Sequence, residues 1–278
     1  MHKASVFKSP QGRDKIRAYY NNILAMVPLA QRTIDTPYGK TFVLEAGSEA
    51  HPPLVLLHGS CSNSAAWLGD LPALAARCHI FAVDLPGEPG NSDEHRPDIE
   101  AGEYTRWLLA VLDALQLRRA ALMGNSMGGW LALQFAAAYP QRTAALLLLA
   151  PSGLVKANPA FLAQTANIAD DTAVAKATGE AVLGDAAMPR EVLEFMVLVM
   201  EHFIPVTGTL PVLTDAQMQA LTMPVLMIAG DADITMDVHA ASLRLKTLVP
   251  SAQCIVQSGS HVVIGAAEQV LSFLDTVL

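Results

Sequence analysis

The sequence predicts an α/β protein in which a mostly parallel sheet is covered by helices on both faces. Short, continuous apolar runs alternate with longer amphipathic stretches along most of the chain, and one long interval interrupts that alternation. Strands that are buried on both faces read as continuous apolar runs, and crossover helices join parallel strands. The 278 residues are enough for one large domain with a modest insertion, and we do not expect two independent domains.

The elements follow from this alternation. The apolar runs predict parallel strands at Leu54–Leu57, Ile80–Val83, Ala120–Met123, Ala145–Leu149, Val225–Ile228 and Cys254–Gln257. The amphipathic stretches predict helices at Ala65–Ala76, Gly102–Leu115, Met127–Tyr139, Val238–Leu248 and Glu268–Val277. Tyr38-Gly39 predicts the turn of an antiparallel edge hairpin, with strands at Thr33–Thr36 and Lys40–Ala46. Apolar residues at helical spacing before Pro28 predict a further helix, packed on the main body.

The interruption lies between Ser152 and Met223, where roughly 10 to 20 residues would suffice for a crossover. Helix-compatible stretches at Phe161–Asn167 and Arg190–Phe203 are separated by prolines. The second stretch is apolar almost all round, so we expect it to be covered on several sides. We therefore predict a helical cap at residues 152–223, inserted between a first core segment at 1–151 and a second at 224–278.

Composition excludes several classes of protein. Hydrophobic residues make up 52% of the chain, but no uninterrupted apolar run approaches 18 residues, and the first 20 residues lack the features of a secretory signal. We therefore expect a cytoplasmic protein without membrane insertion. A net charge of −8 and the lack of a Lys/Arg cluster argue against a nucleic-acid partner. Cys61, Cys78 and Cys254 form no CxxC pair and predict free thiols rather than a zinc site. Nothing in the sequence indicates an oligomeric state.

The strongest chemical signal is Gly124-Asn125-Ser126-Met127-Gly128-Gly129, a G-x-S-x-G placed between a predicted strand and a predicted helix. A tight turn from strand to helix forces its central residue into a strained conformation, and the flanking glycines let the backbones approach closely. The serine hydroxyl is thereby presented above the sheet. Ser126 is the predicted nucleophile.

A serine hydroxyl needs a general base and an acid that orients the base, and both are expected later in the chain. Ala229-Gly230-Asp231-Ala232-Asp233 follows a predicted strand and places two carboxylates at the carboxyl end of the sheet, so Asp231 and Asp233 both remain candidates for the acid. Ser258-Gly259-Ser260-His261 follows the last predicted strand, and His261 is the predicted base. The other histidines, apart from His58, lie on predicted surface loops, strand starts or helices.

His58-Gly59-Ser60-Cys61 follows the strand Leu54–Leu57. A backbone N–H from this loop can join the N–H of the residue after the nucleophile in an oxyanion hole, so the expected donors are the amides of Ser60 and Met127. We expect His58 to hydrogen-bond the loop rather than to act in catalysis.

Together with the loop Asp84–Ser92, these motifs resemble the α/β-hydrolase superfamily from about residue 33 to the end. The resemblance implies an eight-stranded, mostly parallel sheet, a cap between the sixth and seventh strands, and a catalytic acid at Asp233. The elbow is similar both to that of carbon–carbon bond hydrolases acting on ring-cleavage products and to that of many carboxylesterases. Val262 stands where the carbon–carbon hydrolases commonly have an aromatic residue, and the loop Asp84–Ser92 is longer than usual.

We therefore expect a serine hydrolase that cleaves a small, largely apolar carboxylic ester through an acyl-enzyme, without a metal or organic cofactor. The alternatives are a carbon–carbon bond hydrolase of a ring-cleavage diketone, a cofactor-free perhydrolase, and a ligand-binding protein that kept the fold. Methionine and phenylalanine side chains of the cap suggest an apolar pocket wall, or else the cap's own core: Met188, Met196, Met200, Met218, Met223, Phe161, Phe195 and Phe203.

Overall fold

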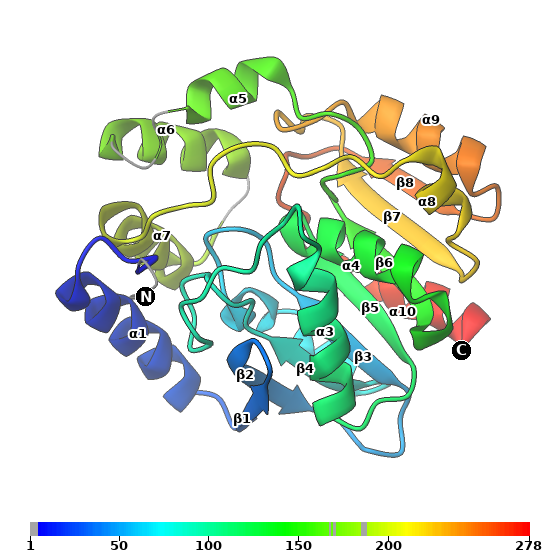
Figure 1. The fold of residues 1–278 in the computed structure, drawn as a ribbon, viewed down its shortest axis with the longest axis horizontal. Coiled ribbons are helices and arrows are strands. Elements are labelled where there is room, and N and C mark those ends of the chain that lie inside the picture. Colours follow the sequence, from blue (N-terminus) through cyan, green and yellow to red (C-terminus); the bar gives the residue numbers. More distant parts are fainter. Residues whose placement is uncertain (1–4, 167, 169–170, 185–187) are drawn as a thin grey trace.

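A computed structural model describes residues 5–166, 168, 171–184 and 188–278. Within them lies one eight-stranded sheet in the order β1-β2-β4-β3-β5-β6-β7-β8 (Figure 1). Its strands are β1 (Ala30–Thr36), β2 (Gly39–Ala46), β3 (Pro53–Leu57), β4 (His79–Val83), β5 (Ala120–Asn125), β6 (Thr143–Leu149), β7 (Val225–Gly230) and β8 (Gln253–Gln257). β2 pairs antiparallel with β1 and with β4, and the remaining pairs are parallel. The predicted fold class and every predicted strand are confirmed.

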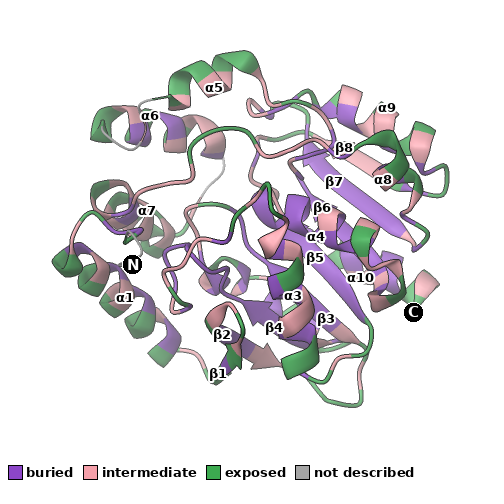
Figure 2. Cartoon of the chain, in the orientation of Figure 1, coloured by how far each residue is buried: buried purple, intermediate pink, exposed green. Residues whose placement is uncertain are grey.

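Successive strand residues enter opposite cores, as the two-residue period of a strand requires. Val55 and Leu57 belong to the cluster under α3 (Glu103–Ala114), α4 (Met127–Ala138) and α9 (Val238–Leu248). Leu54 and Leu56 belong to the cluster under α1 (Pro10–Ala25), α2 (Leu71–Ala75) and α10 (Ala267–Val277). Figure 2 shows the central strands buried over most of their length. The sheet is therefore covered on both faces, as predicted.

One predicted core helix is divided. The stretch Ala65–Ala76 forms a short 3₁₀ helix, Ser64–Trp67, and then α2, which begins at Leu71. Pro72 lies in the first turn of α2, where its missing N–H costs nothing, whereas a helix running through from Ala65 would place it in the interior. The proline therefore sets the start of α2.

The insertion between β6 and β7 contains α5 (Pro159–Thr165), α6 (Thr172–Leu183), α7 (Arg190–His202) and α8 (Asp215–Gln219). Figure 1 shows α6 and α7 on the side of the molecule away from α9 and α10, with α5 at the top between α6 and α9. The sequence predicted α5 and α7 but not α6 or α8, and Asn167 of the predicted first helix lies outside the described residues. Both missed helices carry a sequence signal, because Asp171 caps α6 and Thr214 forms a capping box with Gln217 at α8.

The expectation that α7 is covered on several sides is wrong. Of its residues only Val199 is buried, while Leu193 is 45% and Val197 is 49% exposed. The helix lies at the edge of the molecule, where it packs against α1 and α6 and leaves the rest of its surface open. Apolar composition alone therefore overestimated how many neighbours this helix has.

The N-terminal segment fastens the end of α7. Phe7 and Phe203 form an isolated antiparallel bridge, with backbone hydrogen bonds from Lys8 to His202 and from Ile204 to Val6. The two phenyl rings meet edge to face, with centroids 5.8 Å apart. Phe203 is thus packed in a cluster with the N-terminal segment and not free to line a pocket.

Other side chains of the insertion also pack internally. Met218 and Met223 are buried in the main core cluster. The terminal methyl groups of Met196 and Met200 lie over Gly179 of α6. Met218 and Met223 therefore belong to the internal core, while Met196 and Met200 pack on α6 and are only partly buried.

Both ends of the insertion are pinned to the core. The guanidinium of Arg244 on α9 donates to the carbonyls of Leu154 and Leu213, and the Leu213 amide donates to Gly153 at 2.9 Å. The Asn158 amide donates to the Thr235 carbonyl at 2.8 Å. The two ends of the insertion are therefore hydrogen-bonded to each other and to the core.

No helix among the described residues combines the length and apolar character needed to cross a membrane. Cys61, Cys78 and Cys254 are free thiols, as expected.

We expect Phe203→Ala to lower the free energy of unfolding by about 3–5 kcal/mol, because it empties a fully packed site between α1 and α7. Urea denaturation, monitored by circular dichroism, measures this loss. Leu193→Ala, which truncates an exposed side chain on α7, is the control and is expected to change stability by no more than about 0.5 kcal/mol. Equal losses in the two variants would show that the Phe7–Phe203 contact adds no more to the free energy of unfolding than an exposed side chain does.

Candidate active site

Ser126 occupies the turn between β5 and α4, with φ 52° and ψ −113°. This positive φ is costly for a residue with a side chain. The turn is held by its own backbone, since the Ser126 amide donates to the Leu149 carbonyl at 2.9 Å and its carbonyl accepts from the Trp130 amide at 3.0 Å. The strained conformation is therefore fixed by β6 on one side and by α4 on the other.

Two glycines make this turn possible. A Cβ on Gly128 would lie 2.0 Å from the Leu57 carbonyl oxygen, and one on Gly124 would lie 2.3 Å from the Gly128 carbonyl oxygen. Both contacts are with backbone atoms, which cannot swing away. The first turn of α4 consequently rests directly on the backbone of β3 and β5.

Ser126, His261 and Asp233 lie in one chain of hydrogen bonds. The Ser126 hydroxyl is 2.9 Å from His261 Nε2, and His261 Nδ1 is 2.7 Å from Asp233 Oδ2. The last two side chains are buried, with His261 7% and Asp233 9% exposed. The three candidate residues, 28 to 135 positions apart along the chain, are thus assembled at the carboxyl ends of β5, β7 and β8.

The Asp233 carboxylate is oriented by a residue that the sequence analysis missed. The Thr235 amide and hydroxyl both donate to Asp233 Oδ1 at 2.7 Å, which leaves Oδ2 for His261. Burial raises the pKa of Asp233, but hydrogen bonds from His261 and Thr235 and attraction to the imidazolium outweigh it, so the pKa lies below its ordinary value. An aspartate often accepts the backbone N–H two residues further on, and that rule was a usable signal for Thr235.

Asp231 takes a different position. Its Oδ1 accepts the Gly259 amide at 3.1 Å and so links the loop after β7 to the loop that carries His261. Of the two carboxylates that the sequence left open, Asp233 is the one in contact with the imidazole.

The expected oxyanion donors lie next to Ser126. Gly59 is close enough that a Cβ placed on it would be 3.4 Å from the Ser126 Cβ, and the Ser60 hydroxyl donates to the Met127 sulfur at 3.3 Å. Met127 is the first residue of α4, where a backbone N–H has no partner within the helix. Among the described residues, neither the Ser60 nor the Met127 amide donates to another protein group.

His58 holds the loop from within. It is fully buried, its Nδ1 donates to the Gly59 carbonyl at 2.8 Å, and its Nε2 accepts the Leu85 amide at 2.9 Å. Burial lowers the pKa of His58, against the opposing effects of Asp84 and the Gly59 carbonyl. Both ring nitrogens are engaged, as the expected role in hydrogen-bonding the loop requires.

No group of three or more His, Cys, Asp or Glu side chains within the described residues is arranged to hold a metal ion.

Comparison with known proteins identifies the family. Residues 52–194 match the family model of the alpha/beta hydrolase fold, and the chain belongs to that family. It is 26% identical over 260 residues to an uncharacterised carboxylesterase, nap, of Bacillus subtilis, which covers 89% of this chain and 87% of that protein. The crystal structure of carboxylesterase CesB from Bacillus subtilis superposes with a TM-score of 0.87 at 22% identity, over 96% of this chain and 100% of that one.

A carbon–carbon bond hydrolase has a similar fold as well. The 2-hydroxy-6-oxo-6-phenylhexa-2,4-dienoate hydrolase of Rhodococcus sp. strain RHA1 gives a TM-score of 0.70 at 22% identity, over 90% of this chain and 97% of that chain. The resemblance to the α/β-hydrolase superfamily predicted from the motifs is thereby confirmed.

We expect Gly128→Ala to destabilise the protein strongly, although alanine normally stabilises a helix relative to glycine. The added methyl group would displace α4 from β3 and disturb the Ser126 turn, since its neighbours are carbonyl groups of Leu57 and His58. Thermal unfolding measures the effect. Gly69→Ala is the control, because a Cβ there meets nothing within 4 Å, and its melting temperature is expected to match that of the wild type. Equal melting temperatures in both variants would contradict the close approach of α4.

Proposed function

We propose that the protein is a serine hydrolase of carboxylic esters, in which Ser126 is the nucleophile, His261 the general base and Asp233 the acid that orients it. The observation that carries this proposal is the chain of hydrogen bonds from Ser126 Oγ through His261 to Asp233, at 2.9 and 2.7 Å. Such a chain is the arrangement by which a weakly nucleophilic hydroxyl is activated.

In the proposed reaction Ser126 Oγ attacks the ester carbonyl while His261 Nε2 takes its proton. The imidazolium that forms is stabilised by Asp233, whose lowered pKa keeps it ionised. His261 then gives the proton to the leaving alcohol, and an acyl group remains on Ser126. Water, activated by the same imidazole, releases the acid and restores the hydroxyl.

The amides of Ser60 and Met127 are proposed to hold the oxyanion. Met127 directly follows Ser126, and the Ser60 hydroxyl contacts the Met127 sulfur. Neither amide has a protein acceptor in the described structure. A donor in such a position contributes about 2.7–4 kcal/mol to stabilising the transition state. The Met127 amide also lies at the positive end of the α4 dipole, which favours the developing negative charge.

We propose a small, largely apolar ester as substrate and the insertion at residues 152–223 as the cap that covers it. The Ser260 hydroxyl, next to His261, donates to the Leu183 carbonyl at 2.6 Å, so the end of α6 lies against the loop that carries the base. α6 is built mainly of alanine, valine and leucine, which suit an apolar substrate. The relatives called carboxylesterases support a carboxylic ester as the substrate.

A panel of p-nitrophenyl esters from acetate to laurate, assayed beside a ring-cleavage diketone, tests this proposal. Hydrolysis of the short esters is the expected result. We expect Ser126→Ala to lower turnover by about six orders of magnitude, because the nucleophile is lost, while the thermal melt stays that of the wild type. Retention of more than a few per cent of activity would exclude Ser126 as the nucleophile. Turnover of the diketone alone would assign carbon–carbon cleavage, and labelling by a fluorophosphonate without any turnover would favour a binding protein.

The two aspartates after β7 provide a matched pair of variants. We expect Asp233→Asn to lower kcat by about 10⁴-fold, because the amide favours the wrong imidazole tautomer. Asp231→Asn is expected to lower kcat only slightly, since Asp231 contacts the Gly259 backbone and not the imidazole. Steady-state kinetics on the best ester of the panel measures both. The reverse order of losses would transfer the orienting role to Asp231.

A further inference from the structure

The loop that carries Ser60 rests on the loop after β4, residues 84–94. Hydrogen bonds join the two loops along their length: from Leu85 N to His58 Nε2, Cys61 N to Glu88 Oε2, Asn63 Nδ2 to the Pro89 carbonyl, and Ser64 N to Asp84 Oδ1. The position of the Ser60 amide therefore depends on the loop beneath it.

Glu88 is the acidic side chain of that loop that contacts the residue after Ser60. It is 2% exposed, and its Oε2 accepts the Cys61 amide at 2.6 Å. Its Oε1 is buried without a hydrogen-bond partner in the described structure. Burying a carboxylate costs free energy, so we expect a specific contact to stabilise Glu88 beneath this loop. The contact with Cys61 is the one the structure provides.

Cys61 needs such a contact. Its φ is 59°, in the left-handed region that a residue with a side chain rarely adopts. Ser60 is thus held between Gly59, which lies against Ser126, and Cys61, whose amide is bound by Glu88. Freeing the Cys61 amide would let the Ser60–Cys61 peptide rotate. The backbone at Ser60 would adjust to that rotation, and this adjustment would shift the Ser60 N–H, which lies in the preceding peptide, away from the oxyanion.

We propose that Glu88 is a positioning residue for the oxyanion hole, holding Cys61 in its left-handed conformation so that the Ser60 amide faces the carbonyl under attack at Ser126. This inference rests on the proposed ester hydrolysis and adds a residue that does not itself touch the substrate. An ionised carboxylate is the strongest acceptor available for the Cys61 amide.

The groups around Glu88 make this contact sensitive to pH. Burial raises the pKa of Glu88 to about 7, against the opposing effects of the Cys61 amide and the Arg96 guanidinium. The other titratable groups facing it are the Cys61 thiol and the Tyr104 hydroxyl, whose pKa values burial raises so far that both stay neutral near pH 7. Arg96 donates to the carbonyls of Gly87 and Ile204, and its charge acts on Glu88 without a direct ion pair in the described structure. Glu88 is therefore ionised above about pH 7 and neutral below it.

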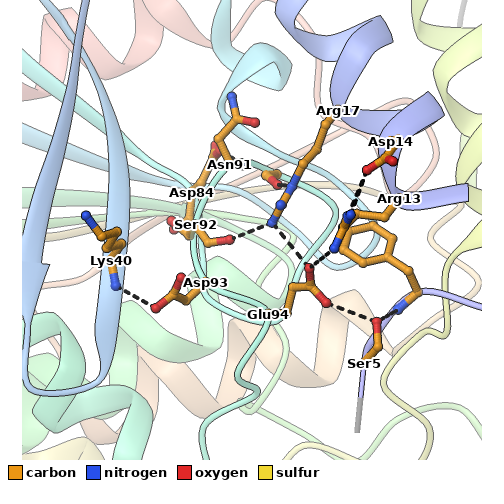
Figure 3. Close-up of polar contacts among 12 residues, drawn as sticks. Ser5, Arg13, Asp14, Arg17, Lys40, Asp84, Asn91, Ser92, Asp93 and Glu94 are labelled. Carbon is orange, nitrogen blue, oxygen red and sulfur yellow. Dashed lines mark hydrogen bonds and ion pairs between the residues drawn. The ribbon is translucent and has the colours of Figure 1, made fainter. Parts of the chain in front are cut away.

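The far side of the same loop offers a control. Figure 3 shows Glu94 between Arg13 and Arg17 of α1, with Ser5 beside it. The Ser5 hydroxyl donates to Glu94 Oε2 at 2.9 Å, and Arg17 also donates to the Ser92 carbonyl. Glu94 thus fastens the loop to the N-terminal segment and makes no contact with the Ser60 loop. Glu94→Gln loosens the loop without touching Cys61.

The test compares wild type, Glu88→Gln and Glu94→Gln on a p-nitrophenyl ester between pH 6 and pH 8, after thermal melts have shown that each is folded. At pH 8 we expect Glu88→Gln to lower kcat about tenfold, because a neutral acceptor holds the Cys61 amide roughly half as strongly as a carboxylate. KM should change little, because the oxyanion forms only as the transition state is approached and not in the bound substrate. At pH 6 the ratio of wild-type to Glu88→Gln kcat should fall to about twofold, since the wild-type carboxyl is then mostly neutral. Any pH dependence that the two proteins share cancels in this ratio.

Glu88→Ala is the second variant, with an expected loss in kcat of about 10²-fold at pH 8, as for removal of one oxyanion donor. Glu94→Gln is expected to keep the wild-type kcat at each pH. A ratio that stays constant from pH 6 to pH 8, an unchanged kcat in Glu88→Gln, or an equal loss in Glu94→Gln overturns the positioning role of Glu88 while leaving ester hydrolysis intact. A wild type that hydrolyses no ester overturns both proposals together.

Discussion

The close approach of α4 to the central strands is the constraint on which the site depends. Backbone touches backbone where Gly128 faces the Leu57 carbonyl, and no side chain can stand between them. This contact places the start of a helix at the end of β5, and the chain can make the turn only by holding Ser126 at a positive φ. The free Met127 amide is a consequence of the same geometry, because it is the first N–H of that helix.

Much of this could be predicted from the sequence because the signals are local. Continuous apolar runs identified the parallel strands, and the glycines around Ser126 have meaning only between a strand and a helix. His58 likewise followed from its place at the end of β3, since loops at the carboxyl ends of parallel strands meet at one edge of the sheet. Where a motif and its neighbouring elements agree, residue pattern is sufficient to place a side chain.

The rest could not be predicted because it depends on contacts between distant segments. Residue chemistry alone does not separate Asp231 from Asp233. The family resemblance favoured Asp233, and the geometry of the loop after β7 is what turns it toward His261. The burial of α7 was overestimated because composition does not say how many neighbours a helix has. Glu88 resembles any loop glutamate until the fold places it beneath Cys61.

The pinned ends of the insertion limit how it can move. Arg244 ties Leu154 to Leu213, and Asn158 is bound to the Thr235 backbone, so a hinge cannot lie at the points where the insertion joins the core. Any opening that began at Asn158 would pull on the loop whose Thr235 orients Asp233. α7 is held in turn by the N-terminal segment. If the insertion covers the site as proposed, these contacts leave α5 and α6 as the part that can move for substrate entry, and such a movement would break the packing of α6 on α7.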